Sequence, residues 1–68
     1  MLTIDDLKIG NKVKSINGKE IYTIVDVNAI MQYNYVWRPC ISYISSTGNL
    51  KYVRTVEDFM LQFDVVHP

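Results

Sequence analysis

Short runs rich in apolar and β-branched residues recur along this chain, separated by residues that favour turns. Alternation with a period of two predicts half-buried β-strands, and the first such strand is expected over 12–16. Asn17-Gly18 follows, and this dipeptide favours a type I′ hairpin turn because both positions tolerate positive φ. The return strand is expected over 20–28, where β-branched residues are dense, with room to continue to residue 32. The first part of the chain therefore predicts a β-hairpin.

A second hairpin is expected in the middle of the chain. Residues 33–35 are expected to form a loop or a hairpin tip, since the central asparagine tolerates left-handed backbone geometry. A third strand follows over 36–44, then a turn rich in Ser, Thr and Gly over 45–49 and a fourth strand over 50–54. Pro39 lies inside the third strand and has no N–H to donate. It therefore marks a sheet edge, a bulge or the true start of that strand.

The period changes near the C-terminus, which favours a short amphipathic helix over 55–63. Its first residue, a threonine, is a candidate N-cap, with Asp58 placed three residues later as in a capping box. The apolar residues that would share one helical face are Val56, Phe59, Met60 and Phe63. Residues 64–66 are expected to add a short last strand. At the other end of the chain, Thr3 is a candidate N-cap for a single helical turn over 3–7.

These elements predict a mainly β fold with one short C-terminal helix, built as a small SH3-like barrel or an antiparallel β-roll. A four- or five-stranded open sheet that carries one helix is the alternative architecture. The chain has 68 residues, of which 49% are hydrophobic and 21% are charged, so a single globular domain over 1–68 is expected. A core of this size gives little net stability, which a partner or a second copy would increase.

Composition narrows the range of functions. The 7 basic and 7 acidic residues give a formal net charge of zero, which weighs against a dedicated nucleic-acid binder but leaves room for a segregated basic face. Cys40 and His67 are the only residues of their types, so we expect no internal disulfide, no Cys/His metal cluster and no cofactor. A buried structural role is the simplest interpretation of Cys40, because His67 is a poor general base at its penultimate position. Without a metal-ligand pattern or a Gly-rich phosphate loop, the chain is expected not to be an enzyme.

The same composition bears on location and source. No stretch is long and apolar enough to cross a bilayer, and the acidic start over 1–6 is unlike a signal peptide. With a single cysteine, a reducing cytoplasm is the expected compartment, which would be the host cytoplasm for a phage protein. Amino acids with AT-rich codons far outnumber those with GC-rich codons, which favours a low-GC bacterium, a phage or a mobile element.

Residues 8–18, with Gly10 and Val13 ahead of the turn at Gly18, resemble the opening of KOW-type and other SH3-like barrels. The Val/Ile-rich strand that follows extends this likeness to residue 27. The tail over 52–66, an arginine followed by an amphipathic helix, resembles the ending of small bacterial and phage barrels. The resemblance implies a fold that binds protein, peptide or RNA and does not catalyse a reaction.

An aromatic series is the first candidate site. Tyr33, Tyr35 and Trp37 are spaced by two, so on one strand their side chains would share a face. Tyr, Trp and Arg dominate the binding energy of protein interfaces, and Arg38 follows directly as a residue at the rim. The predicted protein-binding residues are therefore Tyr33, Tyr35, Trp37 and Arg38. The alternative interpretation is that Trp37 and one tyrosine simply fill the core.

A mixed basic and aromatic set is the second candidate site. Tyr43 and Tyr52 flank the 45–49 turn and are expected to be cross-strand neighbours. Tyrosines that stack on bases, beside cations that hold phosphate, would suit single-stranded RNA or DNA. The candidate nucleic-acid-binding residues are Lys12, Lys14, Tyr43, Lys51, Tyr52 and Arg54, together with Arg38. The alternatives are an ordinary solvated strand face and, for Lys8, Lys12, Lys14 and Lys19, an edge strand protected by lysines.

Three hypotheses for the function follow. The first is a non-enzymatic protein-interaction module, such as a small phage or mobile-element inhibitor that occludes a host protein or pairs with it through an open sheet edge. The second is an SH3-like domain that binds RNA, DNA or the ribosome. The third is a self-associating structural protein. Another protein is the partner that the sequence favours, and a membrane is not expected.

Overall fold

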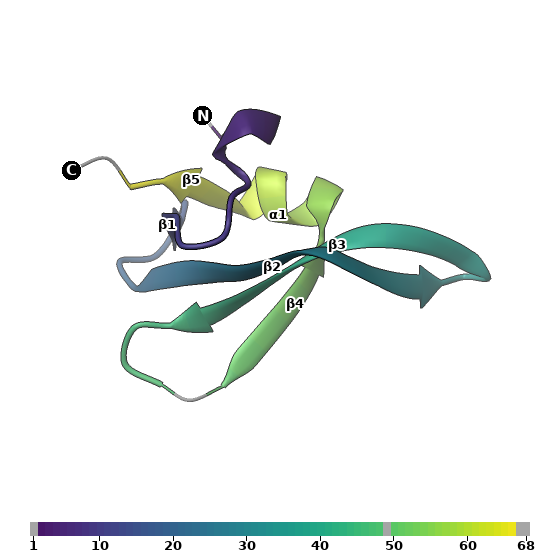
Figure 1. The fold of residues 1–68 in the computed structure, drawn as a ribbon. Helices are drawn as coiled ribbons and strands as arrows, with labels where there is room; N and C mark the ends of the chain where they lie inside the picture. Colours follow the sequence, from purple (N-terminus) through teal and green to yellow (C-terminus); the bar gives the residue numbers. More distant parts are fainter. Residues whose placement is uncertain (1, 49, 67–68) are drawn as a thin grey trace.

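The strands form one sheet. The computed structural model describes residues 2–48 and 50–66. In chain order the elements are η1 (Ile4–Asp6), β1 (Lys12–Ser15), β2 (Ile21–Tyr33), β3 (Val36–Ser45), β4 (Lys51–Thr55), α1 (Val56–Gln62) and β5 (Phe63–Val65). The five strands pair antiparallel in the order β4-β3-β2-β1-β5, and α1 links the two outer strands (Figure 1). The fold is therefore mainly β with one short helix, as predicted, and its open antiparallel sheet fits a small roll.

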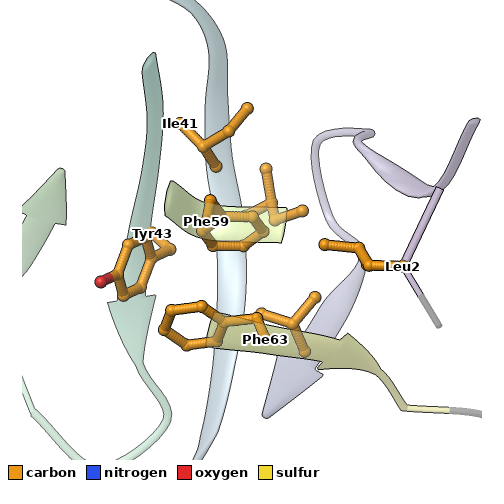
Figure 2. Close-up of a cluster of buried hydrophobic side chains, with 7 residues drawn as sticks. Leu2, Ile41, Tyr43, Phe59 and Phe63 are labelled. Atoms are coloured by element: carbon orange, nitrogen blue, oxygen red, sulfur yellow. The ribbon is translucent and has the colours of Figure 1, made fainter. Parts of the chain in front are cut away.

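The core lies between the sheet and α1. Figure 2 shows the side chains that meet there, from the N-terminal segment, the sheet and the helix. The buried core residues are Leu2, Val13, Ile24, Ile41, Tyr43, Phe59 and Phe63. Phe59 and Phe63 stack with their ring centroids 4.6 Å apart, and Val56 and Met60 pack at the margin. The apolar helical face predicted from the sequence is thus the face that covers the sheet.

Both predicted N-caps lie at helix starts. The Thr55 hydroxyl accepts a hydrogen bond from the backbone N–H of Asp58 at 3.2 Å, which satisfies one of the free donors at the start of α1. Thr3 precedes η1, and its backbone N–H donates to the Asp6 carboxylate at 2.8 Å. The Asp58 carboxylate, which the capping-box pattern directs toward Thr55, bonds Arg54 instead.

Two shifts in the pairing register with β3 divide β2 into two parts. They lie between Ile24 and Asp26 and between Asp26 and Ala29, where β2 has extra residues opposite β3. Such bulges bend a strand and increase its twist. The first half of β2 pairs with both β1 and β3, whereas residues 29–33 pair with β3 alone. Since β4 ends opposite Cys40, residues 29–39 form a two-stranded arm that extends beyond the rest of the sheet (Figure 1).

The turn prediction at Asn17-Gly18 is wrong. Among the described residues, positive φ angles occur only at Gly10, Asn34 and Tyr35, so Asn17-Gly18 does not form a type I′ turn. Strand pairing between β1 and β2 ends earlier, and the Gly18 N–H closes a turn by donating to the Ser15 carbonyl at 3.1 Å. Glycine at the last position of a turn is typical of type I. The two-residue turn with positive φ is instead the one at the tip of the arm.

The sheet order corrects the interpretation of β1 and settles that of Pro39. β1 lies between β2 and β5, so it is not an edge strand, and its lysines do not protect an edge. Pro39 lies opposite Ile30, one residue beyond the end of β4. Hydrogen-bonded and non-bonded pairs alternate from the pair Tyr33–Val36 that closes the two-residue turn, so the Pro39 nitrogen faces away from β2, on the side of β3 that β4 does not reach, which is the sheet-edge interpretation.

A carboxylate joins the two connections at the other end of the sheet. Glu20, just before β2, accepts hydrogen bonds from the hydroxyls of Ser45, the last residue of β3, of Thr47, which follows β3, and of Tyr22. These bonds, led by the one from Ser45, lower the pKa of Glu20 below its usual value of 4.5. The ionised form of Glu20 is therefore the form that holds these connections together.

Replacing Glu20 with glutamine is expected to remove a pH-dependent part of the stability. A carboxyl with a lowered folded pKa stabilises the fold fully above its unfolded pKa, and this contribution is lost as the pH falls through the lower folded value. The wild type should therefore unfold at a higher urea concentration than Glu20→Gln at pH 7, and the two midpoints should converge below pH 4.5. A difference that is the same at about pH 3 and at about pH 7, below and above the usual glutamate pKa, would contradict this assignment.

Candidate functional site

The arm carries the most exposed aromatic side chains of the described chain. Trp37 is 62% exposed and Tyr35 is 95% exposed, and Tyr33 and Ile30 are also largely open to solvent. The interpretation that Trp37 fills the core is therefore wrong. The aromatic rings of the core and its margin are those of Tyr22, Tyr43, Phe59 and Phe63, and Tyr52, which is 40% exposed, contacts Tyr22 and Tyr43 from the surface.

The arm's aromatic residues do not share a face, contrary to the sequence prediction. Gln32 lies opposite Trp37 and Tyr33 lies opposite Val36, and directly opposed residues of an antiparallel pair point to the same side. Tyr33 and Trp37 therefore point to opposite sides of the arm. The chain reverses between them at Asn34 and Tyr35, so a spacing of two along one strand does not apply. The arm presents aromatic rings on both faces and at its tip.

Tyr35 occupies a backbone conformation that tyrosine seldom adopts. Asn34 and Tyr35 form the tip of the arm with φ angles of 50° and 66°. Left-handed geometry costs an L-residue about 1–2 kcal/mol, and glycine usually takes the second position of such a turn. Tyr35 is 95% exposed, so little packing within this chain offsets that cost. Local strain of this kind is concentrated at functional sites.

A cavity of about 600 Å³ opens between the arm, β4 and the start of α1. Its lining residues are Met31, Tyr33 and Arg38 from the arm, Tyr52, Val53, Arg54 and Thr55 from the end of the sheet, Glu57 and Asp58 from α1, and Tyr43. Arg38 lies with its guanidinium 3.7 Å from the Glu57 carboxylate, and the two side chains are 41% and 85% exposed. This ion pair connects the base of the arm to the helix, with little energy expected from so exposed a contact.

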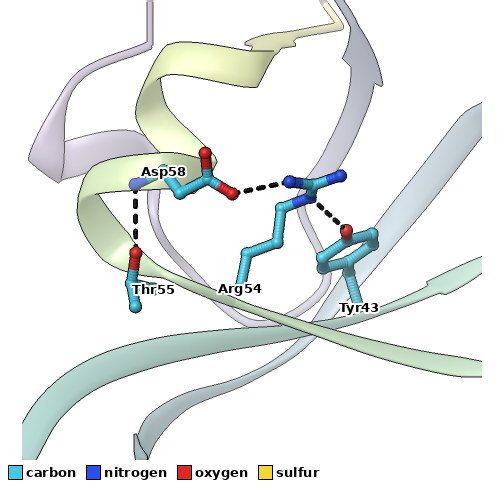
Figure 3. A network of polar contacts seen from close by, with 4 residues as sticks. All are labelled: Tyr43, Arg54, Thr55 and Asp58. Carbon is cyan, nitrogen blue, oxygen red and sulfur yellow. Dashed lines mark hydrogen bonds and ion pairs between the residues drawn. The ribbon is translucent and has the colours of Figure 1, made fainter. Parts of the chain in front are cut away.

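Arg54 is held inside a polar network (Figure 3). Its Nε donates to the Tyr43 hydroxyl at 2.9 Å, and its Nη1 donates to the Asp58 carboxylate at 2.5 Å. The hydrogen bond to Asp58, followed by the one to Tyr43, raises the pKa of Arg54 above its usual value. The guanidinium also lies 5.8 Å from the centre of the Phe63 ring. Arg54 therefore ties β3, β4 and α1 together and is not a free cation.

The residues proposed for nucleic-acid binding do not lie together on one surface. Tyr43 and Tyr52 are cross-strand neighbours, as predicted, with ring centroids 5.6 Å apart. However, Tyr43 is only 3% exposed, so its ring faces are not available to a base. Lys51 points to the opposite side of β4 from Tyr52 and Arg54, because side chains alternate along a strand. Lys12 and Lys14 lie on β1, separated from β4 by two strands.

Cys40 is fully buried, and its thiol donates to the Arg38 carbonyl at 3.4 Å, which fits a structural role. His67, the proposed poor base for Cys40, lies outside the described residues. Within residues 2–48 and 50–66, no group of three or more His, Cys, Asp or Glu residues is placed to hold a metal ion.

The sequence analysis did not predict the ion pair between Arg54 and Asp58. It therefore did not predict that these two residues line the cavity. The spacing of four between the two residues is the signal that was available. It was overlooked because that spacing brings side chains together on a helix, whereas Arg54 belongs to a strand that runs into α1.

Comparison with known proteins finds no protein family that matches this chain, and no curated protein or solved structure matches it either. No helix in the described parts of the chain is long and apolar enough to span a membrane. The functional argument therefore depends on the geometry of the arm and of the cavity beside it.

Proposed function

We propose that this protein is an interaction module that acts by binding another protein, not by catalysis, and that the arm is the element that docks. The observation that carries the proposal is Tyr35, a bulky residue in left-handed geometry that is 95% exposed. Such a residue costs stability and gains little inside the chain. A partner that receives the ring would explain why tyrosine is present where glycine is the favoured residue.

The arrangement of the arm favours insertion over contact through a flat face. Tyr33 and Trp37 point to opposite sides, and Tyr35 lies between them at the tip. A partner that covers all three rings must therefore enclose the end of the arm in an apolar cleft. Arg38 lies at the base, where it would meet the rim of such a cleft, as charged residues do at protein interfaces.

An inserted arm would act by occlusion. A cleft filled by three aromatic rings is closed to its natural ligand, which is how a small inhibitor of a host protein would work. This is the role we propose for the chain in a phage-infected or bacterial cytoplasm. The resemblance of residues 8–27 to SH3-like barrels supports the same class of function, because such barrels bind other macromolecules. The nucleic-acid alternative has less support, because Tyr43 is buried and Arg54 is already bonded to Tyr43 and Asp58.

Replacing Tyr35 with glycine is expected to separate stability from binding. The variant relieves the strained φ angle, so the free energy of unfolding should stay unchanged or rise by up to about 1 kcal/mol. Binding should be lost, because the anchor of the arm is absent. The measurement is urea denaturation together with capture of cytosolic proteins on tagged wild type and tagged variant, each with and without nuclease.

Two further variants make this test specific. Leu61→Ala removes another exposed apolar side chain, from α1, and should leave capture unchanged. Trp37→Ala should lose capture as Tyr35→Gly does, with little effect on stability. Capture that survives both arm substitutions would overturn the proposed function, and capture that disappears with nuclease would favour the nucleic-acid alternative.

A further inference from the structure

β4 is an outer strand whose free edge is open. Among the described residues no strand lies on its far side, and Tyr52 and Val53 of β4, like Leu50 just before it, are exposed. Residues from both faces of β4 line the cavity, so the cavity extends to this edge. An edge of this kind presents unpaired backbone N–H and C=O groups and is a template for a further strand.

We infer that a second copy of this chain occupies the edge, with the two β4 strands paired antiparallel about a twofold axis at Val53. Charge selects this register. An axis at Lys51 or at Arg54 would set like charges directly opposite each other, which destabilises a sheet. An axis between Tyr52 and Val53 would place Lys51 opposite the partner's Arg54. An axis at Tyr52 would pair only part of β4.

The register centred on Val53 pairs all five residues of β4. It places Tyr52 opposite the partner's Arg54, so an uncharged ring and not a second cation faces each arginine. Lys51 lies opposite the partner's Thr55, and Val53 lies opposite its own copy. No two like charges meet directly, and each of these contacts occurs twice because the axis is twofold.

The helix next to the edge adds a complementary charge. The partner's Lys51 comes beside Thr55, the N-cap of α1, on the side of β4 opposite to Arg54 and Asp58. The acidic residue of the first turn that it can reach is therefore Glu57. Glu57 is 85% exposed, and its carboxylate lies no closer than 3.7 Å to the guanidinium of Arg38, so it is open to a second cation. The lysine of one copy thus meets the acidic helix start of the other.

This pairing has a consequence for the arms. In each copy the arm lies at the end of β4 that leads into α1, and antiparallel pairing sets these ends on opposite sides of the dimer. The dimer therefore presents two arms that point away from each other. If the arms dock as proposed, the dimer is bivalent, which raises the apparent affinity for a partner that offers two sites. The dimer itself does not depend on that function.

Charge exchange tests the contact between Lys51 and Glu57. Lys51→Glu places two acidic groups together at both symmetric contacts, and it should weaken dimerisation about tenfold, as measured by sedimentation over a concentration series. The double variant Lys51→Glu/Glu57→Lys restores opposite charges and should regain most of the loss. Lys8→Glu makes the same charge change before β1 and is the matched control, for which no change is expected.

Cross-linking tests the register without relying on charge. In this dimer the two copies of residue 53 lie side by side, whereas the two copies of residue 51 lie about 14 Å apart along the strands at ~3.4 Å per residue. A short bis-maleimide should therefore join two copies of Val53→Cys and leave Lys51→Cys as a monomer. The native Cys40 is fully buried and should not react in the folded protein.

The outcomes separate this inference from the proposed function. A monomer at every concentration, or a dimer that is insensitive to Lys51→Glu and forms no cross-link at residue 53, would overturn the paired edge. Tyr35→Gly should leave the dimer intact, because the arm's tip is remote from the axis. If the dimer forms and capture by the arm fails, the inference stands and the proposed function does not.

Discussion

Phe59→Ala is expected to unfold most of the protein at 25 °C. Phe59 is fully buried, stacks on Phe63 at 4.6 Å and contacts the Tyr43 ring at 5.3 Å. Truncating a buried phenylalanine costs about 3–5 kcal/mol, because apolar contact is lost and a cavity is left. A single core in a domain of 68 residues rarely supplies more than about 3–5 kcal/mol of stability. The loss is therefore comparable to the whole stability.

Circular dichroism with urea denaturation measures this effect. The matched control is Leu61→Ala on the same helix, where the side chain is 73% exposed and a change within about 0.5 kcal/mol is expected. Equal effects of the two substitutions would mean that α1 does not cover the sheet through Phe59. Loss of structure in Phe59→Ala alone would assign the core to the contact between α1 and the sheet.

Local patterns predicted the elements of this fold because the deciding interactions are local. Each of these signals involves residues that are close together in the sequence: the β-branched runs, the Thr55 cap, and the helical spacing of Phe59 and Phe63. The type I′ turn predicted at Asn17-Gly18 is wrong because here a local preference did not decide the structure. The turn preference of two residues was overridden by strand pairing, which ends at Lys14 opposite Ile21 and leaves a longer connection.

The candidate site was predicted in its residues but not in its geometry. The sequence identified Tyr33, Tyr35 and Trp37 as a set, yet it placed them on one face. Which side each ring faces depends on the exact position of the turn, since a shift of one residue moves a side chain to the opposite face. The cavity depends on contacts between β4, α1 and the arm, and the sequence contains no local signal for these.

Arg54→Ala is expected to lower the free energy of unfolding by about 2 kcal/mol. The substitution removes the charged donor to Tyr43 and to Asp58, and hydrogen bonds to charged groups contribute about 1.5–3 kcal/mol when well formed. The lower part of that range applies, because Arg54 and Asp58 are each partly exposed and solvent screens their ion pair. The aliphatic stem of Arg54 adds packing against the aromatic cluster.

A double-mutant cycle assigns this loss to the network. Tyr43→Phe keeps the ring in the core and removes the hydroxyl that accepts from Arg54 Nε at 2.9 Å. If that bond carries energy, Arg54→Ala/Tyr43→Phe should cost less than the sum of the two single substitutions, by about 0.5–1.5 kcal/mol. Arg54→Lys keeps the charge but not the fork of donors, so it should retain only one of the two bonds and fall between wild type and Arg54→Ala. If the free-energy losses of the two single substitutions add exactly, the bond to Tyr43 contributes no stability. Arg54 would then stabilise the fold through Asp58 and packing alone.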